Sequence, residues 1–374
     1  MKNRILRAPL AALPLAVLAT VPSHAQTVAT NDLKETVVTA TRVATRTDAL
    51  LSEVVVIGSD VIEQSAGRSL SEVLSRSAGL QMSANGGLGK QSGLFIRGTE
   101  TRHVLLLIDG VRYGSSTLGS ASLDNIPHGA IDRVEILKGP ASGLYGSDAV
   151  GGVVQIFTKR GQKGFHPQAS VTLGSFGHRS ASAGLRGGND TLTYNLSVGN
   201  LREDGFSSTN PKAGSARYNV DKDGFEQDSV SASLRWVMSP GWTSEVQFTQ
   251  ADGTSRFDQG PGTYDVRGEA TTRVAGWGLE RQWSADSRTR LQLSRSEDKS
   301  DSFSAPGAPS VFNTAQTQWA LQQDWNSAVG NVLVGLESIK EEVSGTQAYA
   351  VTSRTTDAAF VGLTGQAGRH LWQG

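Results

Sequence analysis

From about residue 168 onward, short segments of the sequence alternate between apolar and polar residues with a period of two. Leu192, Tyr194, Leu196 and Val198, for example, alternate with threonine, asparagine and serine. Successive side chains of a β-strand point to opposite faces, so the pattern predicts strands with one apolar and one polar face. Similar segments lie near 169–173, 234–238, 246–248, 291–293, 319–325, 332–336 and 359–363. We expect about ten antiparallel strands in residues 162–374.

Period-two alternation fits a soluble β-sandwich as well as a membrane β-barrel, but three features favour the barrel. The connections alternate between short (187–190, 239–241, 285–287, 326–330) and long (201–228, 251–271, 297–313, 341–355). Outer-membrane barrels have short periplasmic turns and long external loops. Trp236, Trp242, Trp283 and Trp325 flank the short turns, where an interfacial girdle lies. The polar face carries Ser, Thr, Gln and Glu, which suit a wet lumen.

Residues 1–25 have the composition of a secretory signal peptide. Lys2, Arg4 and Arg7 precede an apolar stretch, and small residues end at Ala25, so we expect cleavage before Gln26. The alternative, a membrane-anchoring helix, needs a run of about 20 apolar residues, and this stretch is shorter. The chain is therefore expected to leave the cytoplasm.

Composition excludes several classes of function. The 374 residues carry a formal net charge of zero and no cysteine. Balanced charge gives no basic surface for nucleic acid, and the lack of cysteine excludes disulfides and thiolate metal sites. The glycine-rich segment 87–90 lacks the spacing of a phosphate loop, and the six histidines are scattered singly. We find no catalytic constellation and expect a protein that is not an enzyme.

Residues 43–161 differ from the rest and predict a compact α+β domain. Short apolar strands are expected at 54–57, 95–97, 104–108, 134–137 and 153–158. A short helix is expected after Gly58, and a second from a capping box at Ser69 and Glu72 to Gly79. Loops rich in glycine and serine are expected at 83–92 and 113–122. We expect this domain to sit inside the sheet formed by residues 162–374.

Residues 26–42 predict a polar amino-terminal arm that carries a β-prone heptad. The heptad consists of Glu35, Thr36, Val37, Val38, Thr39, Ala40 and Thr41. An exposed segment of this kind can add as a strand to the sheet edge of another protein. From the residues alone, the simpler interpretation is an ordinary first strand of the following domain.

Four motifs in residues 43–161 resemble the plug domain of TonB-dependent outer-membrane receptors. They are FIRG (95–98), LLLIDGVR (105–112), RVEILKGP (133–140) and LYGSDAVGGVVQI (144–156). The heptad at 35–41 resembles the TonB box of the family, and the resemblance implies that the energy-coupling protein TonB binds and pulls it. The family closes its barrel with about 22 strands. We therefore expect an incomplete transmembrane β-barrel, in a fragment of a longer receptor truncated at its C-terminus.

Within the family, the resemblance is strongest to cobalamin transporters. It rests on VVTATR (37–42), the long stretch 85–112 and GSDAVGGVVQI (146–156). The resemblance implies TonB-dependent transport of cobalamin across the bacterial outer membrane, with lipid around the barrel. A receptor of the same fold for a siderophore or haem is one alternative. A secreted β-sandwich adhesin is an alternative of another class.

The plug is expected to supply two sets of functional residues. Arg97, Arg133 and Glu135 lie in or beside apolar strands, and buried charges need partners, so we expect ion pairs, some of them to the barrel wall. Polar contacts of this kind would let a pulled plug slip without tearing an apolar core. We expect the substrate to contact the apical loops at Gly87, Leu88, Gln91, Ser92, Tyr113 and Ser115.

The long loops contain candidate metal ligands. Asp221 and Asp223 precede a turn glycine like the start of a calcium loop, but the terminal glutamate is absent. The resemblance implies a structural calcium site formed by these residues with Asp258 and Asp265 of the next loop. Ser207 stands where the family pattern has a further aspartate. The alternative interpretation is that these are solvated loop carboxylates.

Overall fold

The computed structural model describes residues 36–37, 39–65, 67–115, 123, 125–214, 216, 218–260, 262, 264–328, 330–367 and 370–374. The chain divides into two units, Met1–Lys34 and Glu35–Gly374, and every described residue belongs to the second. The expected signal peptide, Glu35, Val38 and most of the predicted loop 113–122 lie outside the described residues. No helix in the part described is both long and apolar enough to cross a membrane.

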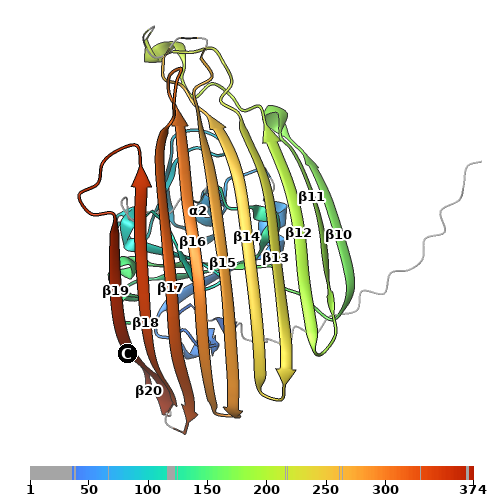
Figure 1. Ribbon diagram of the computed structural model, residues 1–374, viewed down its shortest axis with the longest axis vertical. Coiled ribbons are helices and arrows are strands. Elements are labelled where there is room, and N and C mark those ends of the chain that lie inside the picture. Colours follow the sequence, from blue (N-terminus) through green and yellow to red (C-terminus); the bar gives the residue numbers. More distant parts are fainter. Residues whose placement is uncertain are drawn as a thin grey trace, which may run out of the picture. The chain divides into compact units, whose positions relative to one another are not determined.

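One antiparallel sheet of eleven strands dominates the second unit (Figure 1). Each strand pairs with the next along the chain, so the sheet is a simple meander and not a sandwich of two packed sheets. The prediction of about ten strands is therefore nearly met, with the short β20 as the additional one. The strands are β10 (Gly164–Leu173), β11 (Arg179–Gly188), β12 (Leu192–Glu203), β13 (Phe225–Ser239), β14 (Trp242–Arg256), β15 (Arg267–Ser284), β16 (Ser287–Phe303), β17 (Ser310–Ser327), β18 (Gly330–Gly345), β19 (Ser353–Ala367) and β20 (His370–Gln373).

The connections alternate between short and long as predicted, but the long ones are shorter than the sequence indicated. The connection from β14 to β15 spans only 257–266, and that from β16 to β17 only 304–309. The predicted loops 251–271 and 297–313 were too long because the strands continue through polar residues beyond the apolar segments. Where both faces of a strand carry polar residues, the apolar–polar alternation stops, but the hydrogen bonding between strands continues.

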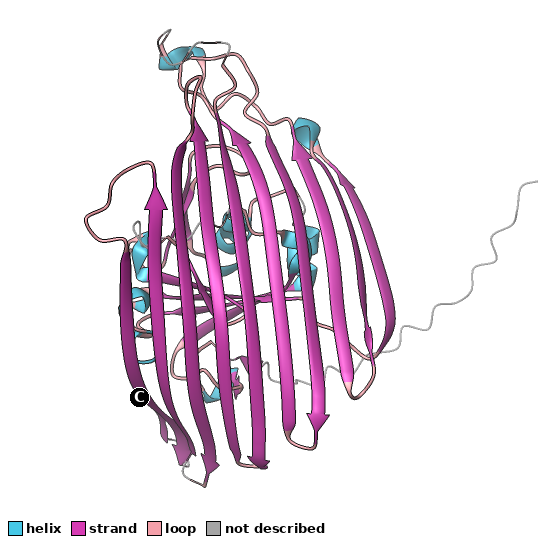
Figure 2. Cartoon of the chain, viewed as in Figure 1, coloured by secondary structure: helices cyan, strands magenta, loops and turns pink. Residues whose placement is uncertain are grey.

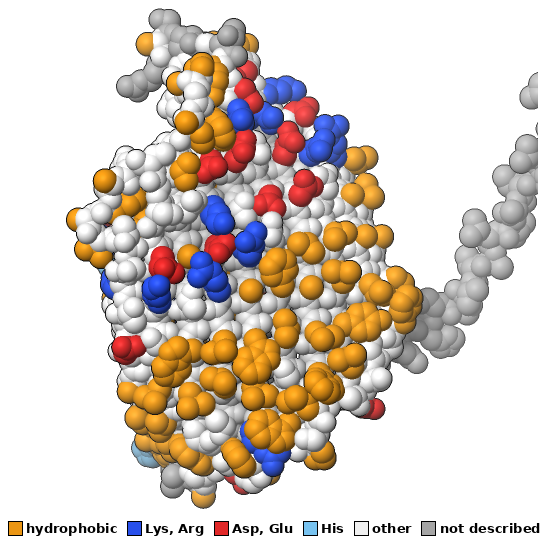
Figure 3. Space-filling model, in the orientation of Figure 1, with side chains coloured by type: hydrophobic (Ala, Val, Ile, Leu, Met, Phe, Trp, Pro, Cys, Tyr) orange, Lys and Arg blue, Asp and Glu red, His pale blue; other side chains and the backbone are white. Residues whose placement is uncertain are grey.

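The outward face of the sheet carries an apolar band bordered by tryptophan (Figure 3). Near the short turns, Trp236, Trp283 and Trp325 are 49%, 60% and 43% exposed. On β17, Trp319 lies six residues from Trp325 and is also exposed. At about 3.3 Å per residue these two rings mark a band about 20 Å tall, close to the roughly 25 Å apolar band of outer-membrane barrels.

The plug domain is built on a five-stranded mixed sheet with strand order β3-β8-β9-β6-β7. All five residues of its strand β6 are buried, because β6 lies between β9 and β7. Figure 2 shows the plug helices and strands behind the long strands, on the face opposite to the apolar band. The strands are β3 (Glu53–Gly58), β6 (Val104–Ile108), β7 (Val111–Tyr113), β8 (Ile131–Lys138) and β9 (Gly152–Thr158).

Smaller elements complete the plug. The predicted cap of the second helix is present, because Ser69 Oγ accepts a hydrogen bond from the Glu72 amide and Gly79 is left-handed (φ 64°). The segments 81–84 and 111–113, which we assigned wholly or partly to loops, contain strands. These elements are α1 (Ser59–Gln64), α2 (Leu70–Ala78), α3 (Ser142–Tyr145), β1 (Thr36–Val37), β2 (Thr45–Arg46), β4 (Gln81–Ala84) and β5 (Ser92–Phe95), with 3₁₀ turns at Thr47–Ala49, Thr101–His103, His128–Ala130, Ser147–Ala149, Ser175–Gly177 and Pro211–Ala213.

The plug has its own apolar core, which we expect to be sensitive to cavities. Ile156 on β9 is fully buried in this core. Ile156→Ala is expected to lower the free energy of unfolding of the plug by about 2–5 kcal/mol, and Ile156→Val by about 0.5–1.5 kcal/mol. Urea unfolding of the plug measures both. Leu51→Ala is the control, because Leu51 is 59% exposed. An equal loss in all three variants would contradict the assignment of the core.

Candidate functional site

The described part of the heptad that resembles a TonB box is folded against the plug. Thr36 and Val37 pair with β2, and Val37, Thr39, Ala40 and Thr41 are buried. The heptad was expected to be an exposed segment beside a flexible tail. The structure instead gives it the position of a short first strand, so a partner that binds it as a strand must first undock it.

A buried carboxylate of the plug binds the arm. Glu135 on β8 is fully buried, and its Oε2 accepts hydrogen bonds from the Thr39 amide at 3.0 Å and from Thr39 Oγ1 at 2.7 Å. Its Oε1 lies 2.9 Å from Arg133 Nη2, so the ion pair expected between these two residues is formed. The guanidinium of Arg133 in turn lies over the ring of Phe157. Oε1 of Glu135 therefore binds the plug, and Oε2 binds the arm.

Arg97 is paired but not buried. Its Nη2 lies 3.0 Å from Glu53 Oε2, and its side chain is 57% exposed. Strand β5 ends at Phe95, and Arg97 itself lies in a left-handed turn (φ 51°), so it is not in the interior strand that we predicted. Lys138 also binds Glu53, and the two cations lower the pKa of that carboxyl. Arg97 therefore forms an ion pair as expected, and its partner lies in the plug.

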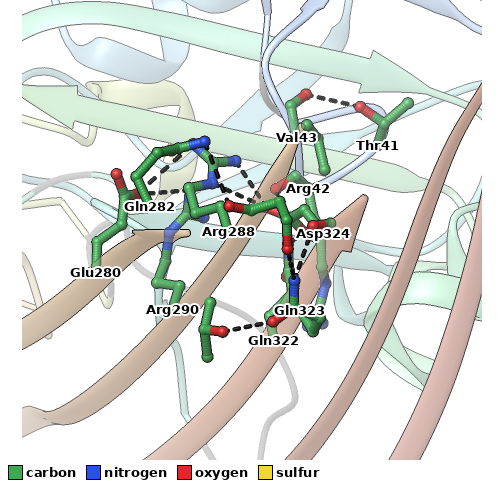
Figure 4. A network of polar contacts seen from close by, with 12 residues as sticks. Thr41, Arg42, Val43, Glu280, Gln282, Arg288, Arg290, Gln322, Gln323 and Asp324 are labelled. Atoms are coloured by element: carbon green, nitrogen blue, oxygen red, sulfur yellow. Dashed lines mark hydrogen bonds and ion pairs between the residues drawn. The ribbon is translucent and has the colours of Figure 1, made fainter. Parts of the chain in front are cut away.

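Arg42, directly after the heptad, joins the arm to the wall. Its Nη1 lies 3.0 Å from Glu337 Oε2 on β18. Its guanidinium lies over the rings of Tyr145 in the plug and Phe360 in the wall, 4.5 Å and 4.3 Å from their centroids. Gln322 Nε2 donates to the Arg42 carbonyl oxygen at 3.4 Å (Figure 4). The arm is thus anchored at Glu135 of the plug and at Glu337 of the wall.

The wall side of this anchor belongs to a charged network on the inner face of β15, β16 and β17 (Figure 4). Gln322 Nε2 also donates to Asp324 Oδ1 at 2.5 Å, and Arg288 Nη2 lies 2.7 Å from Asp324 Oδ2. Glu280 Oε2 lies 3.6 Å from Arg288 and 3.5 Å from Arg290. Withdrawal of the arm would leave this network intact, because it is closed by its own ion pairs.

Glu337 also binds the plug itself. Arg112 Nη2 on β7 lies 3.7 Å from Glu337 Oε1, and Arg112 Nη1 lies 3.3 Å from Asp148 Oδ2. The wall carboxylate is therefore shared between an arginine of the arm and an arginine of the plug. The loss of Arg42 from this site would leave Glu337 with a cationic neighbour, so a buried charge would not be stranded.

Further hydrogen bonds join the plug to the inner face of the sheet. Asn125 Nδ2 donates to the carbonyl oxygens of Ala251 and Ala270, and its Oδ1 accepts from Gln227 Nε2 at 2.9 Å. Gln316 Nε2 donates to the Gly114 carbonyl oxygen at 3.1 Å. These bonds join the plug to the wall through amide and main-chain groups, so this part of the seam is polar.

A cavity of about 360 Å³ lies in the same interface. Strand residues of the wall line one side, and the β6–β7 hairpin lines the other. Its charged and amide lining residues include Asp109, Arg160, Glu245, Gln247, Gln292 and Gln318. These groups provide donors and acceptors for water in this part of the seam.

The residues predicted to contact substrate fall into two groups. Tyr113 and Ser115 are buried at 3% and 5% exposure, and Tyr113 Oη lies 2.9 Å from Thr272 Oγ1 of the wall. They are part of the plug–wall seam and do not face an external ligand, which corrects the prediction. Gln91 is exposed, while Gly87, Leu88 and Ser92 are partly exposed on the loop between β4 and β5 and at the start of β5.

Lys90, in the same loop, is a functional candidate that sequence reasoning missed. It is 5% exposed, and its Nζ donates to the Asp223 carbonyl oxygen and to Ser255 Oγ, both at 3.1 Å, and to the Arg256 carbonyl oxygen. Burial lowers its pKa, although Asp223 acts in the opposite direction. The available signal was a lysine in an otherwise glycine-rich loop. Lys90 couples the plug apex to the loop of the predicted metal ligands.

Three of the four predicted metal ligands converge. Carboxylate oxygens of Asp221, Asp223 and Asp258 lie within 4.8 Å of one another. Asp265 is apart, because Arg256 Nε lies 3.1 Å and Arg267 Nη1 3.6 Å from its oxygens. The prediction that Asp265 joins the cluster is therefore not met.

The converging carboxylates are held by main-chain and hydroxyl donors. The Ser208 amide and Thr209 Oγ1 donate to Asp223 Oδ2 and Asp258 Oδ2, each at 2.5 Å. Among the described residues, no donor reaches the buried Asp258 Oδ1. Burial and the neighbouring Asp258 raise the pKa of Asp221. Crowded carboxylates with an unused oxygen have the donor chemistry that Ca²⁺ prefers.

Comparisons with known proteins agree with this architecture. Residues 46–153 match the family model described as TonB-dependent Receptor Plug Domain. The siderophore receptor PirA of Acinetobacter baumannii is structurally similar, with a TM-score of 0.68 and 18% identity over 84% of this chain and 54% of that one. Residues 46–153 are therefore a TonB-dependent receptor plug, followed by the antiparallel wall of this class. The expected outer-membrane location follows from this class.

Proteins with similar sequences include vitamin B12 transporters. The chain is 30% identical over 338 residues to the Vitamin B12 transporter BtuB of Photobacterium profundum, covering 87% of this chain and 53% of that protein. It is 29% identical over 348 residues to the protein of the same name from Vibrio vulnificus, covering 90% and 55%. The chain thus spans about half the length of the curated relatives it matches.

Loss of the Glu135 carboxylate should release the arm. In Glu135→Gln, the amide nitrogen would face either the Thr39 amide or Arg133, so one set of hydrogen bonds is lost. We expect the population of undocked arm to rise roughly tenfold, as the loss of about 1–3 kcal/mol implies. A spin label on Thr36→Cys in this cysteine-free chain reports the mobile fraction.

Glu53→Gln is the matched control for this measurement. It removes the same charge from a partly exposed carboxyl of the plug that binds Arg97 and Lys138 but does not contact the arm. We expect the label spectrum to stay unchanged in this variant. An equal gain of mobility in both variants would show that plug charge, and not the contact to Thr39, controls the arm.

Proposed function

We propose that the chain takes part in TonB-dependent active transport of cobalamin across the bacterial outer membrane. The observation that carries this proposal is the 30% identity over 338 residues with a protein named as a vitamin B12 transporter. The aligned part covers 87% of this chain. Partners in this proposal are the TonB protein at the arm, cobalamin at the apical loops and lipid around the wall.

The contacts around the arm suggest how binding above and coupling below are connected. Lys90 joins the apical loop of the plug to Asp223 and Arg256, so ordering of those loops acts on the plug. The arm is held by Glu135 of the plug and Glu337 of the wall. A shift of the plug that lengthens either contact favours undocking of the heptad.

The undocked heptad then becomes a strand for the coupling protein. Its β-prone Thr and Val residues suit main-chain pairing with a sheet edge, which supplies the hydrogen bonds that β1 loses on leaving β2. The polar seam between plug and wall would then yield before the apolar plug core. No covalent bond of the substrate changes in this mechanism.

A receptor of the same fold for a siderophore or haem is the second candidate. It is supported by the similarity to solved siderophore receptors such as PirA, and to FpvA of Pseudomonas aeruginosa with a TM-score of 0.71. The identities of 18% and 13% speak for the fold alone. Cobalamin is favoured because the higher sequence identity is with vitamin B12 transporters.

Ligand preference is tested directly by equilibrium binding. The full chain in detergent is titrated with cobalamin and, separately, with ferric siderophores and haem. We expect cobalamin to bind at the lowest concentration, and Lys90→Met to weaken it because the apical loop loses its contacts to Asp223 and Arg256. Tighter binding of a ferric chelate would favour the second candidate over the first.

We also propose a structural calcium ion between the external loops. Asp221, Asp223 and Asp258 would hold it, and the unused Asp258 Oδ1 fits this role. Such an ion would offset two of the three negative charges of these carboxylates and tie the β12–β13 loop to the β14–β15 loop. It supplies order to the loops and takes no part in a reaction.

Proteolysis tests the calcium proposal. Millimolar calcium is expected to protect the 204–224 loop from cleavage, because the ion joins it to Asp258. Asp223→Asn and Asp258→Asn should abolish the protection. Asp265→Asn should leave it intact, because Asp265 binds Arg256 and Arg267. Absence of protection in the unmodified chain, or its loss in the Asp265 variant, would count against this ligand set.

A further inference from the structure

Two phenylalanine rings meet at the end of the sheet that carries the long loops. Phe176 lies in the 3₁₀ turn Ser175–Gly177 between β10 and β11, and Phe206 lies in the loop between β12 and β13 (Figure 2). Their ring centroids are 5.1 Å apart, with an angle of 55° between the ring planes. The two residues are 58% and 42% exposed. This pair is called the aromatic shelf below.

The apical loop of the plug contacts the aromatic shelf. A Cβ atom at Gly87 would lie 3.3 Å from Phe206 Cε1, so the glycine leaves room for the ring. At the neighbouring Gly86, a Cβ atom would lie 3.2 Å from Ser208 Oγ of the same wall loop. Because the plug lies on the face opposite to the apolar band, these contacts put Phe206 on the inner side of the wall. Its exposed ring therefore belongs to the water-facing side and not to the lipid-facing side.

Hydrogen bonds fix the two loops that carry the rings. The carbonyl oxygen of Phe176 accepts from the Gly205 amide, next to Phe206, at 3.1 Å. Beside the turn, Nδ1 of the buried His178 lies 3.0 Å from Oε2 of the buried Glu203 at the end of β12. The aromatic shelf is thus built on loops that are bonded to each other, and its geometry does not depend on the ring contact alone.

The backbone of Phe176 is in a conformation that favours glycine. Its φ of 57° and ψ of 28° lie in the left-handed region, where the Cβ atom of an L residue crowds its own backbone. The ring is exposed, so it does not offset this cost by filling a core. Strained residues of this kind concentrate at sites that clamp ligands. The phenylalanine at this position is therefore better explained by a bound molecule than by the packing of the chain.

We propose that the aromatic shelf stacks on a flat, conjugated ring of the transport substrate. The assignment deepens the proposed function and rests on it, so the substrate is cobalamin. Aromatic rings prefer offset or tilted contacts, and the tilted pair leaves ring surface free for a third ring. With Gly87 of the plug beside the shelf, one ligand contacts the plug and the wall at the same time.

Cobalamin binding to variants without the rings tests the proposal. The full chain in detergent is titrated with cobalamin at equilibrium. Phe176→Ala and Phe206→Ala are each expected to weaken binding roughly tenfold, as the loss of an aromatic side chain that stacks on a flat ring implies. Val351→Ala is the matched control, because it shortens an exposed apolar side chain in the β18–β19 loop. We expect its affinity to equal that of the unmodified chain.

Two further variants separate stacking from simple apolar contact. Phe176→Leu keeps an apolar side chain but has no ring, so it should bind cobalamin as weakly as Phe176→Ala. Phe176→Tyr keeps the ring and should bind as tightly as the unmodified chain. Full affinity in the leucine variant would contradict a stacking role.

Phe176→Gly separates ligand binding from folding. Glycine adopts the left-handed conformation without strain, so this variant should unfold at a higher temperature than Phe176→Ala. We expect both variants to bind cobalamin equally weakly. If the affinity instead follows the unfolding temperature across the unmodified chain and the two variants, the ring supports the fold and the shelf is not a ligand site.

Failure of the shelf and failure of the proposed function give different results. Tight binding of cobalamin by the unmodified chain and by both alanine variants overturns the shelf and leaves cobalamin as the ligand. An unmodified chain that binds no cobalamin, or that binds a ferric chelate more tightly, contradicts the proposed function, and the shelf falls with it.

Discussion

Polar contacts between the plug and the inner face of the long sheet are the interaction on which the rest of the structure depends. The outward face is apolar in its lower half, and the inward face carries Glu337, Asp324, Gln322 and Thr272. A plug seated on such a face is held by hydrogen bonds and ion pairs, together with a small apolar cluster in which Val43 and Leu144 pack on Leu333 and Phe360. Its own core, centred on residues such as Ile156 and Val154, is much larger and meets the wall at Val274 of β15.

The apolar core of the plug and the polar contact between plug and wall therefore have different properties. Exposing apolar side chains of the plug core to water costs free energy in proportion to the exposed area. The core therefore resists gradual displacement. A hydrogen bond between plug and wall can be exchanged for one to water at a small net cost. Glu337 illustrates the point, because Arg112 remains beside it when Arg42 departs. The same carboxylate that docks the arm therefore helps to keep the plug seated after undocking.

The sequence predicted what depends on local pattern and missed what depends on long-range pairing. The capping box at Ser69 and the two-faced strands follow from periods and spacings that adjacent residues set. The convergence of Asp221, Asp223 and Asp258 was predicted through family resemblance. Asp265 instead pairs with Arg256 and Arg267. The partners of Lys90 and Arg42 lie 133 and 295 residues away, and no local signal identifies them. Tyr113 was misassigned for the same reason, because only the folded wall shows that its hydroxyl is bound to Thr272.

The central claim is that one face of each long strand meets lipid and the other meets the plug. Nitroxide labels placed singly at 318, 319, 320 and 321 of β17 in the cysteine-free chain test it most directly, with the chain in lipid vesicles. We predict high accessibility to oxygen at Trp319 and Leu321, which face outward, and low accessibility at Gln318 and Ala320. Equal accessibility at all four positions, or greater access to oxygen at the inward pair, would contradict the account.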